Sequence, residues 1–154
     1  MINAFAEAKK ARKKGEVPVG ATIVKDDKII SRAHNLIISD CDPTAHAEIL
    51  AIKKASKALK NERLNDTTLY CTVEPCSMCA GAMVLARIEK LVFGTKEKKT
   101  GAAGSIVNIV DNKQLNHRIE VKSGLMEREI SALMKKFFEE RRIKKDSRLH
   151  GNDM

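Results

Sequence analysis

The sequence predicts an α/β domain in which helices cover both faces of a sheet that contains parallel strand pairs. Segments typical of strands and of helices alternate along the chain, and the order strand, helix, strand occurs twice. No internal repeat, low-complexity segment or linker interrupts the 154 residues, and 43% of them are apolar, which is enough for a real core. We therefore expect a single domain over residues 1–154.

The individual elements follow from hydrophobic periodicity and from the turn residues between periodic segments. The first helix stops near Gly15, and Lys25-Asp26-Asp27 forms a polar turn between the first two strands. Asp42-Pro43-Thr44 supplies capping and first-turn residues to the second helix, and Pro75 suits the first turn of the third. The predicted helices span 2–14, 45–59, 76–86 and 126–144, and the predicted strands span 17–24, 28–34, 67–73, 88–93 and 118–122.

Two short motifs at the starts of the second and third predicted helices supply potential zinc ligands. A catalytic zinc site keeps three protein ligands so that the fourth position can carry water, and His46, Cys76 and Cys79 give that number. Glu48 is then free to take a proton from the water and to pass it on. His-x-Glu followed by Pro-Cys-x-x-Cys is typical of zinc nucleobase deaminases. The motifs therefore predict metal-assisted hydrolysis with Glu48 as the catalytic residue.

Other interpretations of the cysteines have to be weighed against this one. A lone Cys-x-x-Cys motif is also found in redox pairs and in structural zinc sites. The chain has no second such motif, and Cys41 and Cys71 form no matching pair. A closed structural site would also leave Glu48 without a role. The catalytic interpretation is favoured, and Cys41 and Cys71 are expected to be ordinary small apolar residues.

The charge of the chain points to a polyanionic partner. Lys and Arg number 29 against 20 Asp and Glu, which gives a net charge of +9. Most basic runs can be read as solvated helix faces. The last run follows Phe137-Phe138, so an exposed aromatic ring beside Arg141 and Arg142 would suit single-stranded or splayed nucleic acid. Alternatively both rings belong to the core of the last helix, which spacing favours for Phe137 and leaves open for Phe138.

The N-terminus, the hydropathy and the cysteine content predict where the protein is located. The N-terminus leads directly into a helix, and no apolar stretch approaches the length needed to span a membrane. Four cysteines, at least two of them metal ligands, give no disulfide framework and suit a reducing compartment. We expect a cytoplasmic protein without a membrane partner, ending in a basic helix from about 126 and a flexible tail from about 146.

Several longer segments together resemble one family. The chain is similar, nearly from end to end, to the bacterial tRNA-specific adenosine deaminases of the cytidine deaminase-like superfamily. This resemblance implies a three-layer α/β/α fold with a central mixed five-stranded sheet, in a homodimer with one zinc ion per subunit. It also implies hydrolytic deamination of adenosine to inosine at the wobble position of a tRNA anticodon. The matching segments are 15–21, Asn35 with 42–49, 74–83, 93–94, 99–105, 116–118, and Phe137-Phe138 with Arg141-Arg142.

The resemblance also assigns roles to individual residues. It makes His46, Cys76 and Cys79 the zinc ligands and Glu48 the proton shuttle. Substrate contacts are expected from the following residues: Asn35 to the flipped base, Glu16 and Val17 at the entrance, and Phe138, Arg141 and Arg142 to the anticodon loop.

Two positions depart from the pattern of close relatives. Glu97 stands where Asp is common, and Leu36 follows Asn35 where some relatives carry Arg. Glu97 is expected to accept a hydrogen bond from a ribose hydroxyl or to cap the loop before Gly101, the alternative being a solvated charge among lysines. His117 is expected to be structural, and no function is expected for the two remaining histidines outside the motif.

Two other functions stay open at this stage. A zinc deaminase of a free base or nucleoside, such as cytosine, cytidine or guanine, would share the metal motif but would not need the basic segment after Phe138. A non-catalytic zinc-bearing tRNA-binding subunit would not need Glu48.

Overall fold

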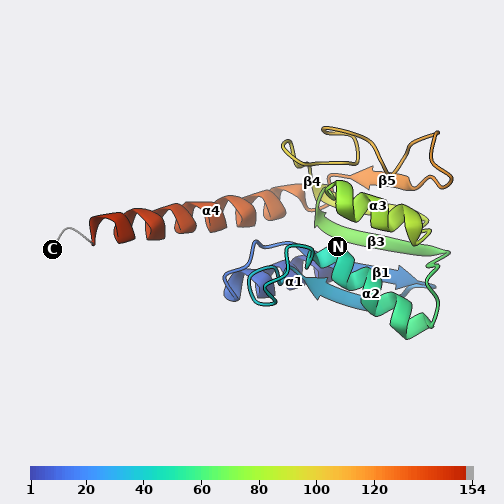
Figure 1. The fold of residues 1–154 in the computed structure, drawn as a ribbon, viewed down its shortest axis with the longest axis horizontal. Coiled ribbons are helices and arrows are strands. Elements are labelled where there is room, and N and C mark those ends of the chain that lie inside the picture. The colour runs from blue at the N-terminus through green and yellow to red at the C-terminus, as the bar shows by residue number, and fades with distance from the viewer. Residues whose placement is uncertain (152–154) are drawn as a thin grey trace.

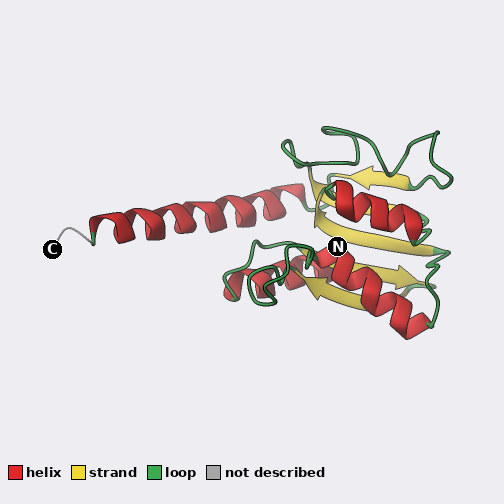
Figure 2. Ribbon diagram, in the orientation of Figure 1, coloured by secondary structure: helices red, strands yellow, loops and turns green. Residues whose placement is uncertain are grey.

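A mixed five-stranded sheet in the order β2-β1-β3-β4-β5 forms the centre of the structure (Figure 1, Figure 2). β1 pairs antiparallel with both β2 and β3, whereas β4 pairs parallel with β3 and β5. The computed structural model describes residues 1–151. Its strands are β1 Gly20–Lys25, β2 Lys28–His34, β3 Thr67–Val73, β4 Lys90–Thr95 and β5 Glu120–Ser123, and its helices are α1 Ile2–Lys13, α2 Ala47–Leu59, α3 Ser77–Leu85 and α4 Glu127–His150.

Helices cover both faces of this sheet, so the predicted three-layer α/β/α arrangement is confirmed. α2 and α3 contact each other and share one core with the sheet, to which α2 contributes Ala47, Ala51 and Ala55 at helical spacing. α1 contacts β1, β2 and β3 and buries its own row of alanines on the other face. Its backbone comes so close to β1 that a Cβ at Gly20 would lie 2.6 Å from the amide nitrogen of Ala8.

The parallel pairing of β3 with β4 determines where α3 begins. The chain leaves the carboxyl end of β3 at Val73, crosses through α3 and returns as β4. In Figure 1, α2 and α3 both start at the end of the domain from which α4 projects. Carboxyl ends of parallel strands and starts of helices are usual places for ligands. The fold therefore brings the two sequence motifs to the same end of the sheet.

The predicted element types are all observed, but several boundaries were wrong. The second and third helices begin later than predicted, at Ala47 and Ser77, because His46 and Cys76 have extended backbones. Asp42 does not cap α2, since its Oδ1 accepts hydrogen bonds from the amide and hydroxyl of Thr44 instead. The first strand begins at Gly20, after Pro18, which has no N–H to donate.

The last helix is longer than the sequence predicted. α4 continues past Lys144 to His150, because its exposed Lys, Arg and Glu residues are good helix formers and no glycine interrupts them before Gly151. The predicted tail from about 146 thus starts inside a helix, and its last residues, 152–154, lie outside the described part of the chain. Within residues 1–151, no helix is both long and apolar enough to cross a membrane.

Candidate active site

Three potential metal ligands converge at the starts of α2 and α3. His46 is the N-cap residue of α2, Cys76 is the N-cap residue of α3, and Cys79 lies one turn into α3. The His46 Nδ1 atom lies 3.7 Å from Cys76 Sγ and 3.5 Å from Cys79 Sγ. The three ligand atoms all lie within 4.8 Å of one another. The structure therefore brings together the three ligands predicted from the motifs.

These separations fit a tetrahedral zinc site. Zinc binds thiolate sulfur at about 2.3 Å and imidazole nitrogen at about 2.0–2.1 Å, so tetrahedral angles set the nitrogen–sulfur separation at about 3.6 Å. The two observed separations lie on either side of this value. No other group of three His, Cys, Asp or Glu side chains in residues 1–151 has this closeness. The donor set, one imidazole and two sulfurs, is one that zinc favours.

Hydrogen bonds distribute the charge within this cluster. The pKa of Cys76 is lowered to about 3, because Cys79 and His46 both donate hydrogen bonds to its sulfur. The hydrogen bond to Cys76 also raises the pKa of His46. The pKa of Cys79 is raised by its hydrogen bond to Cys76 and by burial. Cys76 is thus the thiolate of the pair, at a helix N-terminus where a negative sulfur is favoured.

Glu48 lies next to the ligand cluster and is almost inaccessible to solvent. It is the second residue of α2 and only 3% of its surface is exposed. Burial raises the pKa of its carboxyl, and the hydrogen bond with Cys79 offsets part of this effect. A carboxyl group beside a three-ligand metal cluster, and not itself one of the ligands, is in the position of a general acid and base.

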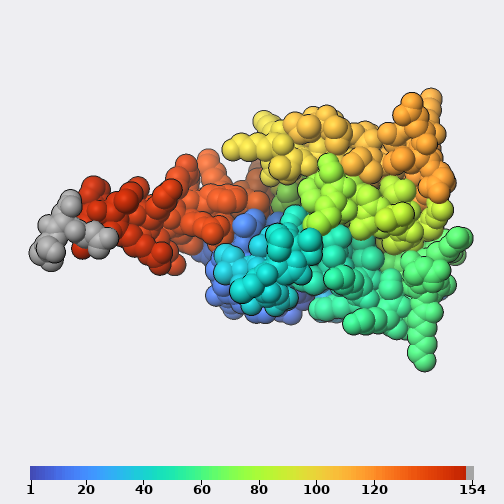
Figure 3. All heavy atoms as spheres, viewed as in Figure 1, coloured from blue at the N-terminus to red at the C-terminus, as the bar shows by residue number. Residues whose placement is uncertain are grey.

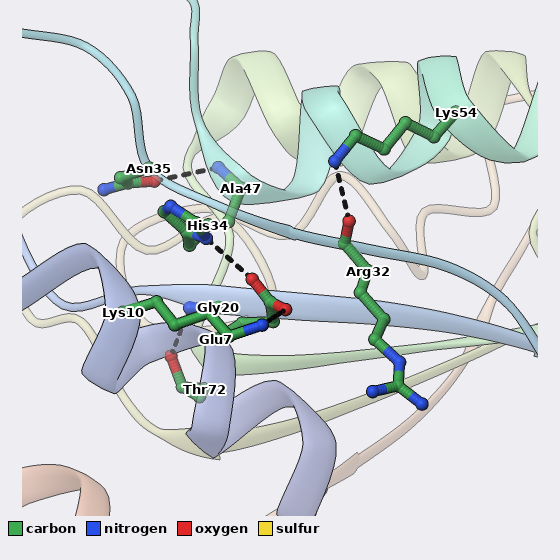
Figure 4. Close-up of polar contacts among 9 residues, drawn as sticks. All are labelled: Glu7, Lys10, Gly20, Arg32, His34, Asn35, Ala47, Lys54 and Thr72. Atoms are coloured by element: carbon green, nitrogen blue, oxygen red, sulfur yellow. Dashed lines mark hydrogen bonds and ion pairs between the residues drawn. The ribbon is translucent and has the colours of Figure 1, made fainter. Parts of the chain in front are cut away.

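Asn35 connects the end of β2 to the start of α2. Its side-chain oxygen accepts a hydrogen bond of 2.8 Å from the amide of Ala47, the first residue of the helix (Figure 4). This bond satisfies one of the free N–H groups at the helix start. It also fixes His46 and Glu48, which flank Ala47. The side-chain nitrogen of Asn35 is its other polar group and can donate to a bound molecule.

His34, the residue before Asn35, connects β2 to α1 through a side-chain hydrogen bond. His34 Nδ1 lies 2.6 Å from a carboxylate oxygen of Glu7, whose other oxygen receives a hydrogen bond of 3.0 Å from Lys10 (Figure 4). Glu7 is 6% exposed, so this is a largely buried interaction. No function was expected for His34, and the contact gives it a structural one.

Glu16 holds the loop that leads to the metal ligands. Its carboxylate accepts hydrogen bonds from the amides of Ile38 (3.0 Å) and Ser39 (2.8 Å) and from the Ser39 hydroxyl (2.7 Å). The side chain is 1% exposed, so the carboxylate faces the loop and not an open entrance. Burial raises the pKa of Glu16, but the hydrogen bonds outweigh it and the net pKa is lowered. Val17 lies beside it, half-buried.

Replacing Glu16 with Gln is expected to lower the free energy of unfolding at neutral pH by about 1–3 kcal/mol, because an amide cannot accept all three hydrogen bonds. The pKa of Glu16 is lower in the folded state than in the unfolded state, where it is about 4.3. Its carboxylate therefore stabilises the folded protein fully above the unfolded-state pKa, and this stabilisation is lost as the pH falls through the folded-state pKa. Urea unfolding of both proteins at about pH 7 and pH 3 should show a smaller difference at the lower pH. An equal difference at both values would contradict this role of the Glu16 carboxylate.

Glu74 is a site residue that the sequence analysis missed. It is 3% exposed and lies two residues before Cys76. Its carboxylate accepts hydrogen bonds from the amides of Glu97 (3.1 Å), Ala103 (2.9 Å) and Ser105 (3.1 Å), and from the Ser105 hydroxyl. These bonds fold the segment after β4 over the start of α3. The sequence offered one signal, an acidic residue between a buried strand and the cysteine motif.

Glu97 closes a turn within the same segment. Its Oε1 accepts a hydrogen bond of 3.0 Å from the amide of Lys99, and its carbonyl oxygen accepts one of 2.9 Å from the amide of Gly101. The predicted capping of the loop before Gly101 is therefore observed. The contact with a ribose hydroxyl stays a prediction.

Gly101→Ala is expected to destabilise the protein by about 1–3 kcal/mol and to lower activity, because the loop has no room for a methyl group. A Cβ at this position would lie 2.5 Å from the Glu74 carboxylate. Gly81→Ala is the matched control, since a Cβ there meets nothing within 4 Å and alanine favours the helix. Thermal unfolding and turnover measure both effects. Equal stability of the two variants would rule out the close packing at Gly101.

The remaining expected nucleic-acid residues lie on α4, apart from the metal cluster. Phe137 is 7% exposed and Phe138 is 42% exposed, so the first ring is a core residue and the second is available at the surface. The rings contact edge to face at a centroid distance of 5.3 Å, and the Arg141 guanidinium lies 5.6 Å from the centre of the Phe137 ring. Arg142 is exposed on the same helix. Figure 3 shows α4, in red, extending outward from the body of the domain.

The other cysteines and histidines have structural positions. His117 Nε2 lies 2.7 Å from the carbonyl oxygen of Ile88, which supports the structural role that was expected. Cys71 is fully buried in the core, as predicted. Cys41, which was expected to be an ordinary small apolar residue, is exposed in a turn with φ of +47° and is not part of the core. His150 is exposed at the end of α4.

Comparison with known proteins places these features in a family context. Residues 1–142 match the family model of MafB19-like deaminases. The tRNA-specific adenosine deaminase of Bacillus subtilis is 50% identical over 145 residues, which cover 94% of this chain and 90% of that protein. The enzyme of the same name from Haemophilus influenzae is 48% identical over 146 residues, covering 94% of this chain and 84% of that protein.

Solved structures give the same result. A structure from a study of A-to-I editing by tRNA:A34 deaminases superimposes with a TM-score of 0.83 at 42% identity, covering 86% of this chain and 96% of that chain. Guanine deaminase from Bacillus subtilis superimposes with a TM-score of 0.58 at 41% identity over 60% of each chain. The agreement extends over nearly the whole sequence and over the fold that carries the metal cluster. The chain belongs to the family of tRNA-specific adenosine deaminases.

Proposed function

We propose that this chain catalyses the zinc-dependent hydrolytic deamination of adenosine to inosine at the wobble position of a tRNA anticodon. The observation that carries the proposal is the buried Glu48 carboxyl beside the His46, Cys76 and Cys79 cluster. That cluster occurs in a chain whose relatives over 94% of its length are tRNA-specific adenosine deaminases.

His46, Cys76 and Cys79 would hold the zinc ion. When bound, zinc supplies Lewis-acid activation of a water molecule, whose pKa it lowers from about 15.7 toward 7. Glu48 accepts a proton from the attacking water and delivers it to N1 of adenine while the water oxygen adds to C6. Glu48 then takes the proton of the new C6 hydroxyl and passes it to the exocyclic nitrogen, which leaves as ammonia while the C6 carbonyl of inosine forms. Adenosine and water are thereby converted to inosine and ammonia.

Neighbouring residues orient the base. The Asn35 nitrogen can donate a hydrogen bond to the base, while the Asn35 oxygen keeps the start of α2 in place. Val17 and the loop that Glu16 holds would line the entrance. Glu16 thus contributes through the loop and not through its own carboxylate.

The target adenine has to be unpaired or extruded, because C6 is out of reach inside a stacked helix. An anticodon loop presents such a base. The exposed Phe138 ring is available to stack on a loop base, and Arg141 and Arg142 are available for loop phosphates. Recognition of the loop by α4 would favour a tRNA anticodon over a free nucleoside as the substrate.

The proposal includes a homodimer with one zinc ion per subunit. Exposed apolar side chains on α3 and on the loop before β5 support a partner surface, among them Leu85 at 81% and Ile106 at 58% exposure. Sedimentation equilibrium would test the dimer. A tRNA substrate and the need for reduced zinc-binding thiols both support a cytoplasmic location.

A deaminase of a free base is the second candidate, supported by the likeness to guanine deaminase over 60% of the chain. The two functions are separated by comparing an anticodon hairpin with free adenosine, guanine, cytosine and cytidine. The hairpin is expected to be by far the best substrate, since free compounds offer neither phosphates nor flanking bases. A free base or nucleoside as the better substrate would overturn the tRNA assignment. A non-catalytic role is disfavoured by Glu48.

Glu97→Gln is expected to slow deamination of an RNA hairpin more than that of the same hairpin with deoxyribose at the target, if Glu97 accepts a hydrogen bond from the ribose hydroxyl. The amide still offers an oxygen to the Lys99 amide, so the turn is largely preserved. Turnover of both substrates by both proteins gives the answer. Equal slowing on the two substrates would leave Glu97 with the loop-capping role alone.

A further inference from the structure

A basic groove lies between the end of α1 and the exposed side of α4. We call it the α1–α4 groove; its volume is about 1080 Å³. Arg12 and Lys13 line it from α1, and Lys144, Lys145 and Arg148 line it from α4 beyond the loop contacts proposed above. The reaction at the metal cluster uses none of these five cations.

Within residues 1–151, one acidic side chain lines the groove, and it is already neutralised. Glu140 forms an ion pair with Arg12 at 2.7 Å, which joins α1 to α4. The other cations of the groove therefore face space in which positive charge strongly predominates. Such a concave surface attracts polyanions, and lysines bind phosphates as point charges.

The cations are arranged along the direction in which α4 leaves the domain. Phe138 lies nearer the domain, and Arg148 lies ten residues further along the helix, or about 15 Å at 1.5 Å per residue. Figure 1 shows that α4 projects from the end of the domain at which α2 and α3 begin, where the metal cluster is located. An RNA with its target base at the cluster and its loop beside Phe138 would continue outward along this helix.

We propose that the α1–α4 groove binds the sugar–phosphate backbone of the double-stranded stem below the anticodon loop. This inference rests on the proposed function, because it places the loop at Phe138. The RNA outside the loop is a stem, and stems are recognised through phosphates and shape more than through base edges. Lys144 and Lys145 then contribute affinity for the stem without reading its sequence.

The test compares Lys144→Ala/Lys145→Ala with a control of equal charge change, Lys28→Ala/Lys57→Ala. Lys28 and Lys57 are exposed and lie at the start of β2 and near the end of α2, at the opposite end of the domain from α4 (Figure 1). Binding of a labelled hairpin and of a stemless oligonucleotide with the same loop sequence is measured at several salt concentrations. A third variant, Lys13→Ala, tests the wall that α1 contributes.

The groove variant is expected to bind the hairpin at least about tenfold more weakly at low salt. The slope of log K against log salt should fall by about 1.8, or roughly 0.9 for each duplex phosphate that is no longer neutralised. Lys13→Ala should lower the slope by about half as much. Binding of the stemless oligonucleotide should change by less than about twofold, and the control variant should match the parent on both RNAs.

Three results would overturn the proposal: an equal loss of affinity for hairpin and stemless RNA, an equal loss in the control variant, or no loss in the groove variant. The last of these would leave the groove to another polyanion, such as an acidic protein segment. Inosine formation by the parent is followed separately. If no inosine forms but binding depends on the stem and on the groove lysines, the proposed function is wrong and the groove proposal stands. If inosine forms but the groove variant binds the hairpin as tightly as the parent, the proposed function stands and the groove proposal is wrong.

Discussion

Glu48→Gln is expected to leave the zinc content and the fold unchanged while turnover falls by at least 10²- to 10⁴-fold, the range for loss of a general acid–base group. Glutamine has nearly the same shape and keeps an acceptor oxygen, but it can carry neither the proton from water to N1 nor the second proton from the C6 hydroxyl to the leaving nitrogen. Because one carboxyl performs both transfers, the loss can exceed this range.

The matched control for this variant is Glu62→Gln, the same exchange at an exposed position after α2. Zinc content by elemental analysis, thermal unfolding and turnover on the hairpin are measured for both. Turnover by Glu48→Gln within a few fold of the parent would remove Glu48 from the mechanism. Loss of zinc together with turnover would assign it to metal binding.

Cys79→Ala is expected to lose the zinc ion and all measurable activity together. Cys79 is fully buried and supplies one of three ligands, and a site with two protein ligands binds zinc far more weakly. The parent should contain about one zinc ion per chain. The variant should contain almost none after dialysis against a mild chelator.

Cys71→Ala provides a close control, since Cys71 is equally buried but is not part of the ligand cluster. It should retain zinc and activity and lose only the stability expected from a small cavity, about 1 kcal/mol. Full zinc occupancy in Cys79→Ala, or zinc loss in Cys71→Ala, would show that the ligand assignment is wrong.

The sequence predicted the metal ligands and the catalytic residue better than the residues that hold the surrounding loops in place. His46, Glu48, Cys76 and Cys79 lie within short motifs whose residue types and spacing are determined by the metal, so they could be identified without coordinates. Glu74 and Glu16 could not, because their partners lie more than twenty residues away in loops without periodicity. Asn35 was expected at the base, but its bond to Ala47 depends on the packing of β2 against α2.

For the fold as well, the sequence predicted the elements better than their boundaries. Alternating apolar patterns identified every strand and helix, and the crossover from β3 through α3 to β4 followed from their order. The helix starts were misplaced because His46 and Cys76 look like helix residues in sequence but adopt extended N-cap conformations. The end of α4 was also missed, since lysine- and arginine-rich sequence suits both a solvated helix and a tail.

Conversion of wobble adenosine to inosine in tRNA can be measured directly by sequencing. Total tRNA that lacks inosine at the outset is incubated with the zinc-loaded protein or with Glu48→Gln. Inosine is read as guanosine, so we expect A-to-G changes confined to the first anticodon position of tRNAs that carry adenine there, and none with the variant. Unchanged adenine at that position in every tRNA would show that the chain is not a wobble adenosine deaminase.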